Sequence, residues 1–200
     1  MALLNVRGVT KRFGGLVALR SVSFKVEKGE LLAIIGPNGS GKTTLFNVIS
    51  GVYKPDEGSI FFEGVDITRY PPHKRARIGI GRAFQIPRPF PGMSVRESVA
   101  VGALFGMTAG NISVDDALKT ADEILKIVGL YEKRLELAGK LTGPEKKMLE
   151  LARAIAMKPK LLLLDEVMAE MPPSEIDRLS KIVRDLAEEG SPQYLLWSML

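Results

Sequence analysis

Apolar residues along the chain fall into two patterns, and the first predicts β-strands. Short apolar runs flanked by turn residues are typical of strands. The pattern predicts strands at residues 2–7, 22–26, 31–35, 59–63 and 160–164. The runs Leu31–Ile35 and Leu161–Leu164 are apolar throughout. They are therefore expected to be buried strands of a parallel sheet.

The second pattern predicts helices. Residues 113–128 place apolar side chains on one helical face, and Gly129 follows as a C-cap. Ser94 and Thr142 each precede a glutamate by three positions, which is the spacing of a capping box at a helix start. A last helix is expected at residues 174–189.

These elements predict a fold class: an α/β protein with a nucleotide-binding P-loop core, an antiparallel β subdomain at the N-terminus and an all-helical insert. No internal repeat interrupts the pattern, so residues 1–200 are expected to form a single domain. Its helical subdomain is predicted at about residues 86–140.

Composition narrows this picture only slightly. The 200 residues are 46% hydrophobic and 26% charged, as in an ordinary folded domain. No apolar stretch in the sequence reaches the ~18 residues that read as a membrane span. Without cysteine, disulfides and cysteine-ligated metals are excluded. The net charge of +5 comes from basic residues dispersed among acidic ones, which predicts a solvated surface and no nucleic-acid partner.

The strongest chemical signal is a phosphate-binding pattern between a predicted strand and a predicted helix. The pattern G-x-x-x-x-G-K-[ST] is matched at every position by Gly36-Pro37-Asn38-Gly39-Ser40-Gly41-Lys42-Thr43, and Thr44 adjoins it. Free N–H groups and the helix dipole favour a polyphosphate there. Lys42 supplies positive charge, and the Thr43 hydroxyl suits Mg²⁺. The alternative is an ordinary glycine-rich turn, but the context favours a nucleoside triphosphate.

Two acidic residues follow the second buried strand. Leu161–Leu164 lead into Asp165 and Glu166 at the expected carboxyl end of a parallel sheet, where α/β proteins bind ligands. Asp165 is predicted to hold Mg²⁺, and Glu166 to take a proton from the attacking water or orient it. The alternative is an acidic strand end without a special role.

With these motifs the chain resembles the ATP-binding subunits of ABC transporters, most closely those of branched-chain amino-acid importers, from about residue 3 to residue 190. The resemblance implies that Phe13, in Lys11–Gly15, stacks on adenine. It also implies that Gln85, in Arg82–Gln85, contacts Mg²⁺ or water and acts with Lys42 and Glu166 in catalysis. The phrases 86–97 and 165–169 are similar to the branched-chain subfamily. As alternatives, Phe13 is an ordinary packed aromatic and Gln85 a plain loop amide.

The chain also departs from the family pattern. Leu141-Thr142-Gly143-Pro144-Glu145 stands where the family has Leu-Ser-Gly-Gly-Gln, which contacts the nucleotide of a partner subunit. Pro144 has no N–H to donate, and Glu145 adds negative charge unless its carboxylate folds back onto the helix start. We expect weakened contact rather than its loss. The residues after Ala169 also depart, which puts the dimer-contact loop there in doubt.

The last ten residues, 191–200, contain no counterpart of the family's switch histidine. The string Trp197-Ser198-Met199, with Ser198 encoded by AGC, contains an apolar–Glu–His reading in the neighbouring frame. We therefore expect a frameshift or a missing C-terminal part, which the coding DNA can test. The alternative is an edge strand at Tyr194–Met199 in a genuine chain.

The resemblance implies an ATP-hydrolysing subunit that uses ATP and Mg²⁺ to power an importer, at the cytoplasmic face of the cell membrane. Its expected partners are a second ATP-binding subunit, alike or homologous, and membrane permease subunits, served indirectly by a substrate-binding protein. The alternative is a nucleotide-binding remnant with little or no hydrolysis. A soluble ABC ATPase acting on DNA or ribosomes is disfavoured by the importer-like phrase at Arg82–Glu97.

Overall fold

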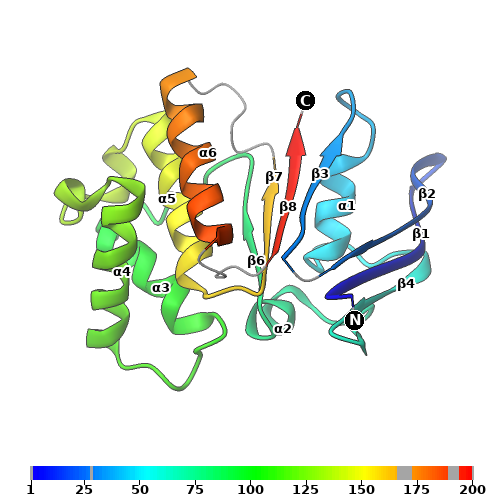
Figure 1. Ribbon diagram of the computed structural model, residues 1–200, viewed down its shortest axis with the longest axis horizontal. Coiled ribbons are helices and arrows are strands. Elements are labelled where there is room, and N and C mark those ends of the chain that lie inside the picture. The colour runs from blue at the N-terminus through cyan, green and yellow to red at the C-terminus, as the bar shows by residue number, and fades with distance from the viewer. Residues whose placement is uncertain (1, 28, 166–172, 189–193, 200) are drawn as a thin grey trace.

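A computed structural model describes residues 2–27, 29–165, 173–188 and 194–199 (Figure 1). An initial β-hairpin is followed by a mixture of strands and helices. In chain order they are β1 Leu4–Phe13, β2 Leu16–Val26, β3 Leu31–Ile35, α1 Lys42–Ile49, β4 Glu57–Phe62, β5 Val65–Asp66, α2 Pro72–Arg77, β6 Ile80–Ala83, α3 Val95–Phe105, α4 Val114–Val128, the 3₁₀ turns Tyr131–Lys133 and Ala138–Lys140, α5 Gly143–Ala156, β7 Leu161–Asp165, α6 Pro173–Glu188 and β8 Tyr194–Met199.

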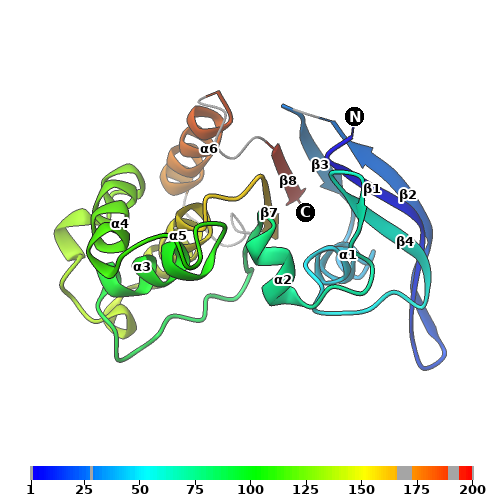
Figure 2. The same cartoon turned by 90° about the horizontal axis from the view of Figure 1, so that it is seen from below.

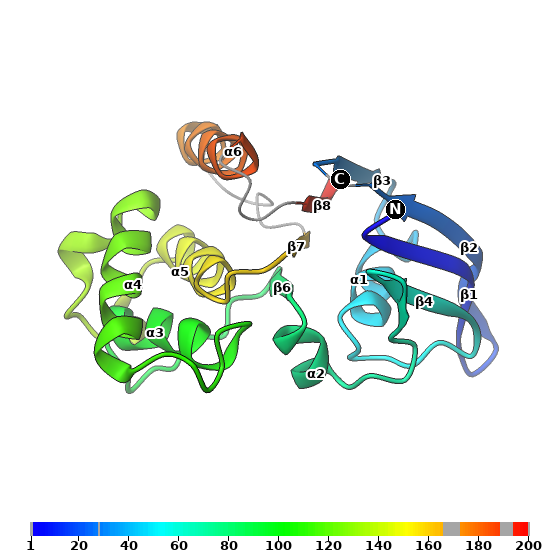
Figure 3. The ribbon, with the colours of Figure 1, turned by 60° about the horizontal axis from the view of Figure 1, so that its bottom comes forward.

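Two sheets organise the molecule. The first has the order β2-β1-β4-β5, and its paired strands run antiparallel. The second has the order β3-β8-β7-β6, and its strands run parallel. Figures 2 and 3 show the antiparallel sheet at one end of the molecule and helices α3, α4 and α5 at the other. The predicted fold class is confirmed.

Strand β7 of the parallel sheet is buried on both faces. Leu161 and Leu163 belong to an apolar cluster with α1 and the antiparallel sheet. Leu162 and Leu164 belong to the other cluster, with α3, α4, α5 and part of α6. Because side chains alternate between the faces of a strand, a continuous run of leucines is what a strand between two cores needs.

The helix boundaries follow their predicted caps. Ser94 and Glu97 form the capping box of α3. At α4, the Ser113 side chain accepts a hydrogen bond from the Asp116 N–H, and Gly129 ends the helix in the left-handed conformation at φ 70°. These predictions are confirmed because a cap needs only residues within one turn of the helix end. Helix α2 was not predicted.

One expectation and one alternative about strands are wrong. Strand β3 was expected to be buried, but among the described strands it pairs only with β8, and Leu31 and Ile35 are 46% and 74% exposed. Leu32 and Ile34 pack on the cluster around α1, so one face of this edge strand is covered and the other is open. Conversely, Tyr194–Met199 forms a strand with neighbours on both sides, β3 and β7, and not an edge strand.

Candidate functional site

The segment Gly36–Gly41 leads from the end of β3 into α1, as the sequence predicts. Gly41 has a φ of 93°, and a Cβ on it would lie 2.5 Å from the carbonyl oxygen of Ala18 in β2. Only glycine fits this conformation and this close approach. Gly41, the N-cap of α1, has no side chain that could cap the helix, so the loop presents backbone groups at a helix N-terminus.

Lys42, the first residue of α1, lies back across this loop. Its side chain is 6% exposed, and its ammonium donates to the carbonyl oxygens of Gly36 at 2.5 Å and Pro37 at 3.1 Å. The next residues, Thr43 and Thr44, continue the first turn of α1. Between Gly36 and Gly41, the four residues Pro37, Asn38, Gly39 and Ser40 form an exposed turn. It is closed by a hydrogen bond of 3.2 Å from the Ser40 N–H to the Pro37 carbonyl.

Asp165 lies at the carboxyl end of β7 and is 1% exposed. The Thr43 hydroxyl donates to its Oδ1 at 3.5 Å, although 122 positions separate the two residues. The parallel sheet produces this approach, because β7 and the loop after β3 end at the same edge. Glu166, the predicted water-activating residue, lies outside the described residues.

Arg82 on β6 is the residue of this site that sequence reasoning missed. Its Nη2 lies 2.7 Å from Asp165 Oδ2, with the two side chains 5% and 1% exposed. Burial lowers the pKa of the Arg82 guanidinium, and the hydrogen bond and charge of Asp165 oppose that shift. The available signal was an arginine within an otherwise apolar strand. It lies on the same face as Ile80, and so on the face of Asp165.

One pocket of about 610 Å³ gathers groups from distant parts of the chain. Its wall includes Thr43, Gln85 and Asp165, the three residues predicted as magnesium ligands, together with Arg82 and Tyr53. Gln85 follows β6 by two residues and is exposed to this pocket. The structure thus brings the three predicted ligands to one place.

The oxygen donors in this pocket suit Mg²⁺. Among the described residues no three acidic, histidine or cysteine side chains form a metal cluster. Magnesium does not require one, since it keeps several waters and is held by one or two carboxylates together with substrate phosphates. A hydroxyl, an amide and one carboxylate beside a phosphate-loop pattern therefore fit this ion.

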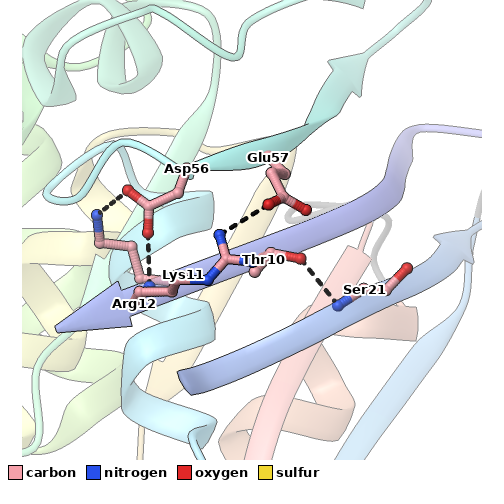
Figure 4. A network of polar contacts seen from close by, with 6 residues as sticks. All are labelled: Thr10, Lys11, Arg12, Ser21, Asp56 and Glu57. Atoms are coloured by element: carbon pink, nitrogen blue, oxygen red, sulfur yellow. Dashed lines mark hydrogen bonds and ion pairs between the residues drawn. The ribbon is translucent and has the colours of Figure 1, made fainter. Parts of the chain in front are cut away.

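Phe13 ends β1 at the tip of the hairpin and is 43% exposed. Its ring contacts that of Tyr53 edge-on, with centroids 5.3 Å apart, and Tyr53 also lines the pocket. A carboxylate holds the end of β1 in place: Asp56 accepts from the Arg12 N–H at 2.5 Å and from the Lys11 ammonium at 2.9 Å (Figure 4). The hairpin tip is therefore tied to the segment that carries Tyr53.

A second pair of bonds joins the same strands in Figure 4. Arg12 Nη1 donates to Glu57 at 2.7 Å, and the Ser21 N–H donates to the Thr10 hydroxyl at 3.1 Å. Both bonds link β1 to its neighbours β4 and β2. They hold the hairpin from both sides just before Phe13.

The departure at residues 141–145 has a local solution. The Glu145 carboxylate accepts from the Thr142 N–H at 2.9 Å and forms an ion pair of 2.6 Å with Lys133. Together these contacts, Lys133 first, lower the pKa of Glu145. The carboxylate has therefore folded back onto the start of α5, as the sequence allowed, and its charge is compensated by Lys133.

The proline-rich segment after Gln85 crosses from the parallel sheet to the helices without regular structure. The Arg88 N–H donates to the Glu150 carboxylate of α5 at 2.9 Å. Arg153 donates to the Arg88 carbonyl at 3.0 Å and lies over the Phe90 ring, 4.5 Å from its centroid. This segment is therefore bound to α5 along its length.

The strand–loop–helix arrangement and the Thr43–Asp165 approach define the class of P-loop nucleotide-binding proteins. Residues 19–169 match the sequence pattern of the ABC transporter family. The chain belongs to that family and is an ATPase of the ABC type, a subunit of transporters. ATP-binding subunits of this family bind ATP, form dimers and work with membrane components.

Individual relatives narrow the class. The chain is 41% identical over 181 residues to the "Probable branched-chain amino acid transport ATP-binding protein LivG" of Archaeoglobus fulgidus, covering 86% of this chain and 70% of that one. It is 38% identical to the high-affinity branched-chain amino acid transport ATP-binding protein BraF of Pseudomonas aeruginosa, covering 97% and 80%.

A solved structure shows the same fold. A dimeric ATP-binding cassette in a post-hydrolysis state, bound to ADP and Pi, is 26% identical, with a TM-score of 0.89 over 98% of this chain and 87% of that one. In the part of this chain that the structure describes, no helix has the length and apolar character needed to cross a membrane.

Proposed function

We propose that this chain binds and hydrolyses ATP to power an ABC importer for branched-chain amino acids. The observation that carries the proposal is the approach of the Thr43 hydroxyl to the buried Asp165 carboxylate beside the Gly36–Gly41 loop. The names of the LivG and BraF relatives support the substrate class.

The phosphates are proposed to lie against the loop at the start of α1. The phosphates would be surrounded by the backbone N–H groups of Gly36, Asn38, Gly39, Ser40 and Gly41. Pro37 lies in the same loop but has no N–H to donate. Lys42 would exchange the carbonyls of Gly36 and Pro37 for phosphate oxygens. Thr44 would add a contact from the first turn of α1, and Phe13 would stack on the adenine ring.

Thr43, Gln85 and Asp165 are proposed to hold Mg²⁺. The ion neutralises negative charge on the phosphates when it is bound. Glu166 follows Asp165 directly and is proposed to orient the attacking water and accept its proton. Lys42 and Gln85 would hold the transferring phosphoryl group and the water in line. The chain's own part in hydrolysis is therefore positioning and proton transfer.

The partners proposed are a second ABC ATP-binding subunit and integral permease subunits at the cytoplasmic face of the cell membrane. A substrate-binding protein would act indirectly, and no nucleic acid is involved. The helical subdomain at about residues 86–140 is proposed to transmit movement to the permease. The packing supports this, because Glu150 and Arg153 of α5 bind Arg88 in the segment after Gln85, and α5 packs against α3 and α4.

The test is ATP binding by calorimetry with Mg²⁺ and with EDTA. We expect Lys42→Ala to weaken ATP binding under both conditions, and Asp165→Asn to weaken it mainly with Mg²⁺. Exposed Lys126→Ala on α4, far from the pocket in sequence and fold, is the control. Wild-type protein that binds ATP no better with Mg²⁺ than with EDTA would refute the proposal.

A further inference from the structure

Arg82 is a buried cation between the phosphate loop helix and the end of β7. We propose that Arg82 is a positioning residue for Asp165: it holds one carboxylate oxygen so that the other stays directed at Thr43 and the metal position. The inference rests on the proposed function, because it concerns the Mg²⁺ ligand of that site.

The two oxygens of Asp165 have different partners. Oδ2 lies 2.7 Å from Arg82 Nη2, and Oδ1 lies 3.5 Å from the Thr43 hydroxyl. Rotation of the carboxylate would break a charge-assisted bond in a place nearly closed to water, with Arg82 and Asp165 only 5% and 1% exposed. The orientation of Oδ1 is therefore set from the far side of the carboxylate.

The guanidinium is itself anchored at its other end. Arg82 Nη1 donates to the Asn47 side chain at 2.8 Å and to the Ser50 hydroxyl at 2.9 Å, both at the end of α1 or just after it. Because the guanidinium is planar and rigid, fixing Nη1 also fixes the direction of Nη2. The flexible ammonium of a lysine would not be fixed in this way. The C-terminal end of α1 therefore orients Asp165 of β7 through Arg82, and Asp165 in turn faces Thr43 in the first turn of α1.

Stability alone is a poor explanation of this ion pair. A buried pair is often matched or exceeded in stability by apolar residues of similar volume. In addition, Arg82 Nε is buried without a hydrogen-bond partner among the described residues, and such a group lowers the stability of the fold. What an apolar side chain could not supply is the fixed direction of the Asp165 carboxylate.

The structure offers substitutions that separate direction from charge. Arg82→Lys keeps the charge and loses the fork. Ser50→Ala removes one acceptor of Nη1 and leaves the ion pair, so it serves if Arg82→Lys does not fold. Arg75→Lys is the matched structural control, because Arg75 is 1% exposed and binds the Val48 and Ile49 carbonyls at the same C-terminal end of α1, without contacting Asp165. Arg77→Lys is the exposed control.

The readout is the ratio of ATP affinities with Mg²⁺ and with EDTA, accompanied by Mn²⁺ binding to the protein–ATP complex by electron paramagnetic resonance. For Arg82→Lys we expect the ratio to fall about 10–100-fold, as for loss of an outer partner of a metal ligand, with ATP affinity in EDTA nearly unchanged. Ser50→Ala should lower the ratio less. Both controls should keep it, even if Arg75→Lys melts at a lower temperature.

Three outcomes would count against the proposal in distinguishable ways. An unchanged ratio in Arg82→Lys overturns the positioning role and leaves the proposed function standing. An equal fall in Arg75→Lys overturns it too, because general loosening of α1 would then explain the effect. Wild-type protein without any Mg²⁺ enhancement refutes the proposed function itself, and this inference with it.

Discussion

Single residues in this molecule acquire their properties from a few short-range partners. Lys42, Arg75 and Asp165 are all at most 6% exposed, and each is satisfied differently. Lys42 donates to two loop carbonyls, Arg75 to five backbone carbonyls, and Asp165 accepts from a guanidinium and a hydroxyl. Burying a charged group without hydrogen-bond partners costs folding free energy. The segments that supply the partners of each buried charge must therefore stay together in the folded protein.

Arg75 provides a first test at this scale. Its guanidinium joins the end of α1 to the segment Ile67–Tyr70, and burial lowers its pKa to about 10, so it stays charged at neutral pH. Arg75→Met would leave several carbonyls unsatisfied at about 1–3 kcal/mol each before relaxation. We expect the free energy of unfolding in urea to fall by about 3–5 kcal/mol. Exposed Arg77→Met should change it by less than about 0.5 kcal/mol. A loss below about 1 kcal/mol for Arg75→Met would contradict this account.

Glu145 gives a prediction about pH. Because the pKa of Glu145 is lowered in the folded protein, by Lys133 first and the Thr142 N–H second, its stabilising effect is present above its ordinary pKa of 4.5. That effect is lost as the pH falls through the lowered value. Glu145→Gln should therefore cost about 0.5–1 kcal/mol at pH 7 and progressively less below pH 4.

The measurement is urea unfolding of wild type and variant from pH 7 to pH 3. Exposed Glu123→Gln on α4 is the matched control and should follow the wild type at every pH. A difference for Glu145→Gln that stays constant or grows toward pH 3 would show that the carboxylate is not the stabilising form.

At the scale of elements, the sequence predicted what depends on neighbours in the chain. The capping boxes at Ser94 and Thr142, the stop at Gly129 and the phosphate-loop pattern all lie within one helical turn or one short loop. For the same reason the leucine run at 161–164 could be assigned to a strand between two cores. The local signals agree with the global fold, so these features can be assigned from the sequence.

What the sequence did not predict depends on which strands become neighbours. The ion pair of Arg82 with Asp165 requires β6 beside β7, and the edge position of β3 follows from its pairing with β8. Likewise, Asp56 reaches Lys11 and Arg12 only because β4 pairs with β1. The order of strands in a sheet cannot be deduced from any one segment of the sequence, so these contacts become visible only in the folded structure.

The hairpin β1–β2 supports a prediction about the proposed adenine contact. An aromatic–base stack is worth about 1–3 kcal/mol, so Phe13→Ala should weaken ATP binding about 5–150-fold, and Phe13→Trp should largely preserve it. Asp56→Ala should act in the same direction more weakly, because it releases the Arg12 N–H next to Phe13. Calorimetry would measure these affinities, with exposed Val65→Ala on β5 as the control. Unchanged ATP binding in Phe13→Ala would leave Phe13 as an ordinary packed aromatic.

At the scale of the whole molecule, the candidate site is a product of the layering. The pocket takes Thr43 from α1, Gln85 from the segment after β6 and Asp165 from β7. The same segment after β6 passes along α5, where Glu150 and Arg153 form hydrogen bonds with Arg88. A displacement of Gln85 would therefore act on contacts with α5, and through α5 on the packed helices α3 and α4. This continuous packing supports the proposed transmission of movement from the nucleotide site to the permease.

The last prediction concerns assembly, because ATP-binding subunits of this family form dimers. The test uses the Glu166→Gln variant, which lacks the proposed proton acceptor but keeps the proposed phosphate and Mg²⁺ contacts. We expect this variant to hydrolyse ATP about 10²–10⁴-fold more slowly and to keep ATP bound. With Mg²⁺ and ATP, light scattering should then give the mass of a dimer. Adding Lys42→Ala to the same variant should return a monomer, because the nucleotide would no longer be held between the subunits. A Glu166→Gln protein that binds ATP tightly and stays monomeric would contradict a homodimer and assign a different homologous subunit as the partner.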